Sequence, residues 1–567
     1  MSFQHTDSIA LSELEGRAPT HSDLESRGIT SSKEKDFKED VKETVADSPV
    51  DSDVLIRDGV QRKLGQRHIQ MIAIAGTIGT GLFLGSGGAL HTAGPLGALL
   101  AYVIVGTVTY SMICSLGEMT SFAPISGTFP HYAARWVDPA LGFAVGWNFW
   151  YQSVTSIPTE ITAATILLTF WDENINNQKI YTAVICVAVI SINIFGVRAF
   201  GESEFIFSII KILLIIALLI AGLIIDLGGG PSGERIGFRY WRNPGPFNRA
   251  GLVESNIATD QFLAFVQIFV QAAFSFGGME AIAIAASETE SPRRNVAKAI
   301  GRVFWRILIF YVFGILMIGM LVAYDDPALL TDTGNAAQSP FVIAMDRAGV
   351  KVFPHIINAA VFTSAFSAGN TTLYSSSRIL YGLALRGQAP RFLTYCTKRG
   401  LPLFAVLISS SFAFLSFMRV SKGSEGVFEW LVNIVTIGSL ISWLTINVTF
   451  LFFRRGMIAQ GIDMRKNVYH NRYQPWLALW GVLWLSMFIL VNGYAVFFQW
   501  NTTDFLVAYI NIPIFAALYF GYKIIMRTKI WKPHEMDLIT GIPSIEETEL
   551  PREPPHTIGG KIAAVLF

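Results

Sequence analysis

Two apolar segments of this chain contain clusters of glycine, at places where a helix would otherwise run without interruption. One reads Gly76-Thr77-Ile78-Gly79-Thr80-Gly81, and the other reads Phe274-Ser275-Phe276-Gly277-Gly278-Met279-Glu280. Glycine clusters are poor helix formers. A helix broken inside a membrane leaves amide groups that attract an anion and carbonyl groups that accept from a cation. Together the two segments predict a site for a carboxylate and an ammonium group, the backbone pattern of an α-amino acid.

A glycine cluster also has a simpler explanation, because small residues allow helices to pack closely. Two such clusters, at the start of two halves of five apolar segments each, favour the binding site. Phe274 lies at the second break, where its ring can close over a bound substrate as a gate or serve in ordinary packing.

Lys211 lies in the apolar run Ile209–Leu213, far from the ends of its segment. A charged group at this depth is costly and is a functional candidate by default. We expect Lys211 to exchange a proton, or its ammonium group to take the place of a coupling sodium ion. The alternative is a lysine whose side chain extends to the lipid headgroups.

Two glutamates also lie inside apolar segments: Glu160 follows Pro158, and Glu280 follows the second glycine cluster. For Glu280 a structural or gating role is favoured, because it lies beside freed amide groups, and proton coupling is the alternative. For Glu160, proton coupling and structural hydrogen bonding are both open. Glu118 is expected to form a salt bridge near the end of its segment.

The composition indicates a membrane protein. Of 567 residues, 52% are hydrophobic and 15% are charged, whereas soluble domains have roughly 25% charged residues. Apolar segments of bilayer length must be helices, because lipid offers no partners for backbone groups. We therefore predict an all-α integral membrane protein with twelve transmembrane helices. The segments are 70–90, 95–122, 140–168, 179–197, 201–226, 262–287, 303–324, 352–380, 402–419, 428–453, 476–499 and 504–526.

Polar arms flank this twelve-helix core of residues 67–526. Residues 1–66 are rich in Ser, Glu, Asp and Lys and are predicted to be a disordered arm, and residues 527–567 to be a flexible tail. Basic residues concentrate in alternate loops, which places both termini in the cytoplasm.

Several classes of function are disfavoured. A net charge of +1 provides no positive electrostatic potential that would attract nucleic acid. The three cysteines have no metal-ligand spacing, and no phosphate-binding G-x-x-x-x-G-K-[ST] motif occurs. We expect no enzyme activity, no metal and no cofactor.

The segments resemble fungal amino acid permeases, the yeast amino acid transporter family of the amino acid–polyamine–organocation superfamily. The resemblance extends from about Leu64 to Lys529. It rests on Arg67-His68-Ile69-Gln70-Met71-Ile72-Ala73-Ile74, Pro124-Ile125-Ser126-Gly127-Thr128-Phe129, Phe143-Ala144-Val145-Gly146-Trp147-Asn148-Phe149-Trp150, Arg239-Tyr240-Trp241, Pro244-Gly245-Pro246-Phe247, Ala272-Ala273-Phe274-Ser275-Phe276 and Ser291-Pro292-Arg293-Arg294.

This resemblance implies a LeuT-type fold with two inverted repeats of five helices, at about 70–226 and 262–453. The first and sixth helices are broken, and two peripheral helices follow at 476–526. It also implies proton symport of amino acids across the plasma membrane, with a lipid bilayer, a substrate and a proton as partners. Ubiquitin ligase machinery would act on the N-terminal arm, which carries Lys33, Lys35, Lys38 and Lys42.

The resemblance also assigns site residues. The substrate carboxylate would meet the amides of Gly79, Thr80 and Gly81. The ammonium would meet carbonyls near Thr77, Ile78, Phe274 and Gly277, with Ser275 in the same break and Phe274 as the gate. Lys211 would face hydroxyls of the eighth span, for which Ser364 and Ser367 are candidates. Candidates for the side-chain pocket are Ser156, Thr159, Ser439 and Ser442.

One motif departs from the family. Permeases of this family commonly have Gly-Thr-Glu where this chain has Gly278-Met279-Glu280, and the missing hydroxyl bears on substrate preference rather than on fold. Two other functions stay open: an amino acid sensor with little transport, and a permease for another small nitrogen compound.

Overall fold

The structure is a computed structural model that describes residues 71, 78–125, 127–172, 174–230, 233–286, 289, 291–330, 339–350, 352–398, 400–420 and 427–549. The chain divides into two units, residues 1–57 and 58–567. All the described residues belong to the second unit. The expectations for the N-terminal arm and for Thr77 fall outside the described residues.

The described part of the chain is helical and contains no β-strand, which confirms the predicted all-α class. The helices of its first half, in chain order, are η2 (Gly81–Gly85), α5 (Ser86–Phe122), α6 (Thr128–Trp136), α7 (Pro139–Leu168), α8 (Ile175–Ile194), α9 (Val197–Asp226), α10 (Arg239–Arg242), α11 (Ile257–Ser275) and α12 (Ala281–Ala286).

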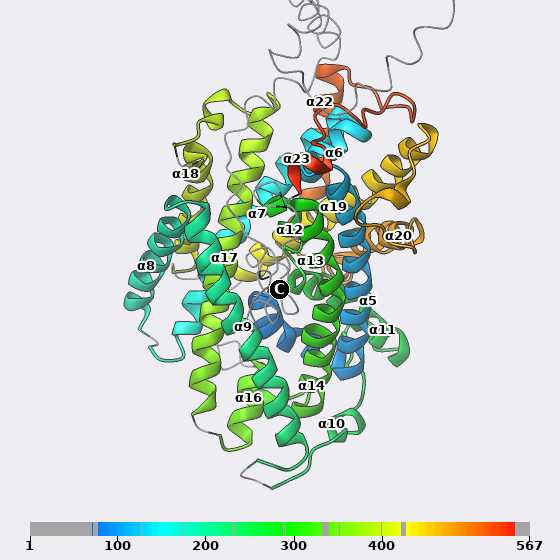
Figure 1. Ribbon diagram of the computed structural model, residues 1–567. Coiled ribbons are helices and arrows are strands. Elements are labelled where there is room, and N and C mark those ends of the chain that lie inside the picture. Colours follow the sequence, from blue (N-terminus) through cyan, green and yellow to red (C-terminus); the bar gives the residue numbers. More distant parts are fainter. Residues whose placement is uncertain are drawn as a thin grey trace, which may run out of the picture. The chain divides into compact units, whose positions relative to one another are not determined.

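The helices of the second half are α13 (Pro292–Arg306), η3 (Ile307–Val312), α14 (Phe313–Leu321), α15 (Pro327–Leu330), α16 (Pro340–Arg347), α17 (Phe353–Leu385), η5 (Arg391–Thr394), α18 (Leu403–Ser411), η6 (Phe412–Val420), α19 (Val427–Ala459), η7 (Met464–Lys466), α20 (Trp476–Val491), η8 (Tyr494–Phe497), α21 (Thr502–Tyr509), α22 (Asn511–Met526) and α23 (Ile545–Thr548). Figure 1 shows their arrangement, with α10 and α16 near one end of the long helices and α6 and α23 near the other.

Seven helices of the described residues are long and apolar enough to cross a membrane, or eight if the bent pair α21 and α22 is one span. The prediction of twelve spans is therefore reproduced in part. The helices α7 and α17 have 30 and 33 residues, which exceeds the roughly 20 that a bilayer requires. They are not among the seven, and both contain many serine, threonine and asparagine residues.

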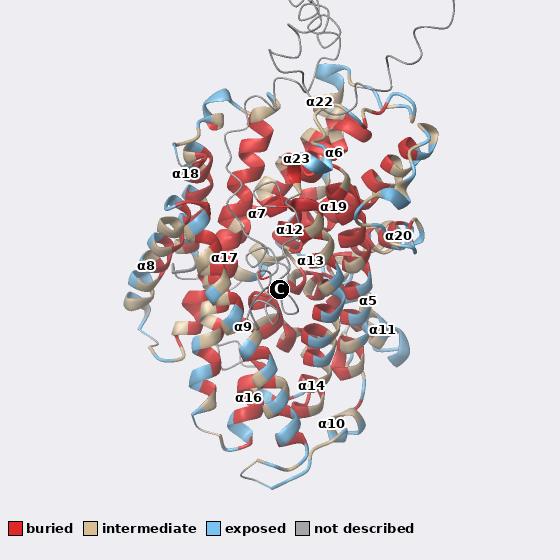
Figure 2. Cartoon of the chain, viewed as in Figure 1, coloured by how far each residue is buried: buried red, intermediate tan, exposed pale blue. Residues whose placement is uncertain are grey.

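Burial separates central helices from peripheral ones (Figure 2). In the most apolar window of α19, 78% of the residues are buried inside the protein, but in that of α8 only 28% are. The exposed side chains of the peripheral helices include large apolar ones, such as Val187 of α8, Leu213 of α9 and Leu490 of α20. Such a surface is stable only against lipid or another apolar partner.

The sixth predicted segment is broken where its glycines lie. Helix α11 ends at Ser275, residues 276–280 form turns, and α12 begins at Ala281. Gly278 has a φ of +82°, a left-handed conformation that glycine adopts without a Cβ penalty. The backbone therefore changes direction at this point because glycine is present.

The first predicted segment is also interrupted. Ile78 and Gly79 are not helical, and a helix begins at Thr80 and continues through the π-helix η2 into α5. Gly94, with a φ of +76°, ends this helical part, and Pro95 begins the second predicted segment. A Cβ at Gly94 would lie 2.8 Å from the backbone N of Asn248, so glycine also allows the loop before α11 to pack here.

Part of the C-terminal tail is packed against the core, contrary to the prediction of a flexible tail from residue 527 onward. Arg135 of α6 donates from Nε to the carbonyl of Asp537 at 2.7 Å. The backbone N of Arg293, in α13, donates to Glu549 Oε1 at 2.9 Å. Residues as far as Glu549 therefore connect two helices that belong to different predicted repeats.

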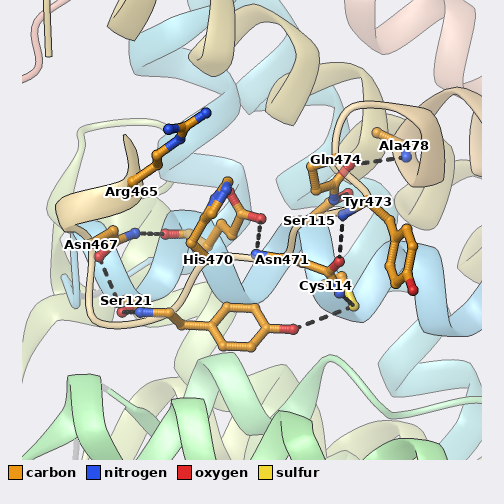
Figure 3. A network of polar contacts seen from close by, with 12 residues as sticks. Cys114, Ser115, Ser121, Arg465, Asn467, His470, Asn471, Tyr473, Gln474 and Ala478 are labelled. Atoms are coloured by element: carbon orange, nitrogen blue, oxygen red, sulfur yellow. Dashed lines mark hydrogen bonds and ion pairs between the residues drawn. The ribbon is translucent and has the colours of Figure 1, made fainter. Parts of the chain in front are cut away.

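The loop before α20 is attached to α5 by a polar network, which Figure 3 shows in close view. Glu118 of α5 is fully buried and accepts a hydrogen bond from the backbone N of Asn471 at 2.8 Å. His470 Nδ1 lies 3.4 Å from the same carboxylate. The predicted salt bridge near the end of this segment thus corresponds to a buried carboxylate that organises the loop, with histidine as its ionisable partner.

Candidate functional site

The two broken segments meet at Gly81. A Cβ on this glycine would lie 2.7 Å from the Cα of Ser275 and 3.0 Å from Phe274 Cδ1. Contacts this short to backbone atoms leave no room for any side chain. Glycine is therefore required at this position for the start of η2 to approach the end of α11.

A cavity lies between the two breaks and the helices around them. It contains about 730 Å³ of space free of protein atoms, a volume that includes open space at its mouth. Its lining is mostly small or polar and comes from η2, α7, α11, α12, α17 and α19. The lining residues are Gly79, Gly81, Phe149, Gln152, Ser153, Ser156, Glu160, Phe274, Ser275, Gly277, Gly278, Glu280, Ala281, Ala368, Thr371, Thr372, Ser375, Val435, Thr436 and Ser439.

Many of the predicted site residues lie at this cavity. Those in its lining are Gly79, Gly81, Ser156, Glu160, Phe274, Ser275, Gly277, Glu280 and Ser439. Phe274 is only partly buried, and it borders the cavity where the two breaks touch. Ile78 and Thr80 are fully buried beside it. Ile78, Thr80, Thr159, Lys211, Ser364, Ser367 and Ser442 are not part of the lining. Thr159 donates to the carbonyl of Thr155, and Ser442 accepts from Asn148.

Both breaks have hydrogen bonds to neighbouring helices. The carbonyl of Ile78 accepts from Ser364 Oγ of α17 at 2.8 Å. Ser275 Oγ lies 2.9 Å from Tyr102 Oη of α5, at hydrogen-bond distance. Glu280 Oε2 accepts from Trp443 Nε1 of α19 at 3.2 Å. Each bond fixes non-helical backbone or a buried polar group beside the cavity, where an unpaired group would be costly.

The Glu160 carboxyl group lies against the first break. Oε2 accepts from Thr80 Oγ1 at 3.2 Å, and the Thr80 backbone hydrogen-bonds the same carboxyl group. A Cβ on Gly79 would lie 3.1 Å from Oε1. Glu160 therefore contacts the same backbone that the sequence analysis assigns to the substrate carboxylate.

Lys211 lies fully buried in α9, and Glu204 of the same helix lies beside it. The distance from Lys211 Nζ to Glu204 Oε1 is 3.8 Å, and both side chains are almost completely inaccessible to solvent. Ser367 of α17, a predicted neighbour of Lys211, donates to Glu204 Oε2 at 2.7 Å. The sequence analysis did not identify Glu204, although a spacing of seven residues from Lys211 places both on one helix face.

The arrangement offers hydrogen-bond donors, acceptors and ionisable groups. Among the residues described, no group of three or more His, Cys, Asp or Glu side chains is placed to bind a metal ion. A helical membrane protein with a polar cavity between two interrupted helices belongs to the class of membrane transporters.

Similar proteins narrow this class to a family. Residues 68–535 match the model of the amino acid permease family. The chain therefore belongs to this family of transporters, which confirms both the resemblance seen in the sequence and the expectation of no enzyme.

Several fungal permeases are similar to this chain over most of its length. A dicarboxylic amino acid permease of Saccharomyces cerevisiae is 37% identical, over 85% of this chain and 80% of its own. A proline-specific permease of Emericella nidulans is 38% identical, over 87% and 91%. A basic amino-acid permease of Saccharomyces cerevisiae is 36% identical, over 87% and 86%. Because these names cover acidic, neutral and basic amino acids at similar identity, sequence similarity does not select a substrate.

A solved structure shares the fold. A manganese transporter of Eremococcus coleocola superposes with a TM-score of 0.50 at 15% sequence identity, over 83% of this chain and 94% of that chain. At this identity the similarity concerns the fold alone.

Proposed function

We propose that this protein imports L-amino acids across the plasma membrane together with protons, by alternating access. The observation that carries the proposal is the cavity at which two interrupted helices meet, with Gly79 and Gly81 on one side and Gly277 on the other. The backbone near Gly79, Thr80 and Gly81 would bind the substrate carboxylate. Carbonyl groups near Ile78, Phe274 and Gly277 would bind the ammonium group.

The proposed architecture is two inverted repeats of five helices, with α20 to α22 as peripheral helices and both termini in the cytoplasm. The breaks at Ile78–Gly79 and at 276–280 occupy corresponding positions in the two repeats. In this arrangement one repeat moves against the other around a site near the middle of the membrane.

Ionisable groups at the cavity support coupling to protons. Glu160 and Glu280 line the cavity, and Lys211 of α9 is buried beside Glu204. A proton moving inward through 100 mV releases roughly 2.3 kcal/mol, which is enough for about a 50-fold substrate gradient. Substrate and proton must bind the outward and inward states differently to use this energy.

Uptake measurements test the coupling. In cells that express the full chain, a labelled amino acid should accumulate above its external concentration, and a protonophore should abolish the accumulation. Accumulation that resists the protonophore would contradict proton symport. Binding of amino acids without uptake would favour the sensor, and uptake of another nitrogen compound alone would favour the other permease.

The cavity lining also predicts a substrate class. Its polar side chains from α7, α17 and α19 are mainly hydroxyls and an amide, its two ionisable groups are carboxyls, and no described lining residue is basic. We propose that neutral amino acids are preferred over dicarboxylic ones, because a second substrate carboxylate would have no cationic partner. In competition against one labelled substrate, serine or threonine should inhibit uptake at lower concentration than aspartate or glutamate. The opposite order would contradict the substrate class and leave the symport proposal intact.

A further inference from the structure

Among the ion pairs of the described residues, the pair of Glu204 and Lys211 is the most enclosed. Neither side chain is exposed by more than 1%. Transfer of two charged groups out of water is costly, and their attraction offsets this cost only when the two remain together. Removal of either partner would leave the other charge buried without compensation.

The pair is linked to the first break through α17. Ser367 donates to Glu204 Oε2 at 2.7 Å, and Ser364, one turn earlier, donates to the carbonyl of Ile78 at 2.8 Å. A single helix therefore holds both the backbone at the break and the acidic member of the pair. Movement of the break during transport would be transmitted to Glu204.

Two further charged residues act on Lys211. Glu160 of α7 attracts it, and Arg306 of α13 repels it. The carboxyls of Glu160 and Glu204 both interact with Lys211, whereas Arg306 also interacts with Tyr311. Two acidic groups and one further cation therefore act on Lys211.

The contacts of the two carboxyls differ. Glu204 lies 3.8 Å from Lys211 and forms an ion pair that is electrically neutral without a further proton. Glu160 is instead hydrogen-bonded by Thr80, and a buried carboxylate that is held by hydrogen bonds rather than by an adjacent cation is neutralised most simply by binding one proton. We propose that Glu204 is the fixed counter-ion of Lys211, and that this pairing leaves Glu160 as the carboxyl that binds and releases the transported proton.

The inference rests on the proposed function and assigns roles within it. Glu160 is the group in contact with the break, since Thr80 hydrogen-bonds its carboxyl. When Glu160 takes up a proton, its negative charge no longer competes with the substrate carboxylate for that backbone. Proton binding and substrate binding therefore favour each other, as symport requires. Glu204 acts through Lys211 and is a positioning residue.

Charge-paired variants test this assignment. The full chain is reconstituted into liposomes, and two activities are measured for each variant: accumulation driven by an imposed pH gradient, and exchange of labelled for unlabelled amino acid. Lys211→Met and Glu204→Gln should each lose accumulation, because each leaves one charge without its partner. The double variant Lys211→Met/Glu204→Gln removes both charges and should recover accumulation on the order of tenfold over Lys211→Met.

Variants of single carboxyls complete the test. Glu160→Gln should lose accumulation but retain exchange. The rate of that exchange should no longer depend on pH. Glu204→Asp keeps the charge and should accumulate substrate. Glu202→Gln, the same change two residues away in a partly buried position, is the matched control and should behave like the unchanged protein.

The outcomes separate the two proposals. A double variant no better than Lys211→Met, or inactive Glu204→Asp, would show that Glu204 is not simply a counter-ion. Full accumulation by Glu160→Gln would remove Glu160 as the proton carrier. If the unchanged protein does not accumulate substrate under the pH gradient, the symport proposal itself fails, independently of any variant.

Discussion

Replacement of Gly81 by alanine is expected to lower amino acid uptake on the order of tenfold or more, while the protein still reaches the cell surface. The added Cβ would lie 2.7 Å from the Cα of Ser275 and 3.0 Å from its backbone N. Forced overpacking of this kind costs about 1–3 kcal/mol, and here it separates the two interrupted helices that form the cavity. Initial rates of uptake at several substrate concentrations, normalised to surface protein, measure the effect.

Gly85 provides the matched control for this prediction. It lies in the same π-helix, and a Cβ built on it meets nothing within 4 Å. Gly85→Ala should therefore transport at close to the normal rate. Equal kinetics for the unchanged protein and the Gly81 variant would contradict the placement of the substrate between the two breaks.

Replacement of Lys211 by alanine is expected to abolish accumulation, so that the ratio of internal to external substrate falls to about 1. The change removes the buried cation that Glu204 contacts at 3.8 Å and that Glu160 also faces. Without it, the Glu204 carboxylate remains buried in a poorly solvated site without its ion-pair partner. Steady-state accumulation in energised cells measures the effect.

Leu213→Ala controls for the loss of a side chain from the same helix. Leu213 lies two residues away and is 62% exposed, so its removal should leave accumulation unchanged. A Lys211→Ala variant that accumulates substrate normally would exclude a role for this lysine in coupling. If Lys211→Ala loses accumulation but keeps normal surface expression and exchange, the defect lies in coupling rather than in folding.

Much of the fold could be predicted from the sequence, because membrane helices have a strong local signal. Long apolar segments identified α8, α9, α19 and α20 to within several residues, and glycine clusters located the break after Ser275 and the non-helical residues before Thr80. These features depend on backbone preference and on hydrophobicity within one segment. No knowledge of neighbouring helices is needed for them.

Features that depend on contacts between distant segments were not predictable in the same way. Glu204 lies near the start of its segment beside Glu202, a position that is typical of an interfacial residue, and only its contact with Ser367 of α17 shows that it belongs to the interior. The tail is polar and rich in proline, yet Met536 and Leu538 are buried to within 4% exposure. Two apolar residues in a polar stretch give no periodic pattern, so their burial depends on surfaces provided by the core.

The bend at Gly94 has a consequence for how the transporter can move. The backbone on either side of this bend is hydrogen-bonded to the loop before α11, since Leu96 N donates to the carbonyl of Pro246 and Asn248 N donates to the carbonyl of Ala93. At the other end of the same segment, Ser364 Oγ donates to the carbonyl of Ile78. Any movement of this segment relative to α17 must therefore break the bond at Ile78, whereas the end at Gly94 keeps two hydrogen bonds to the loop.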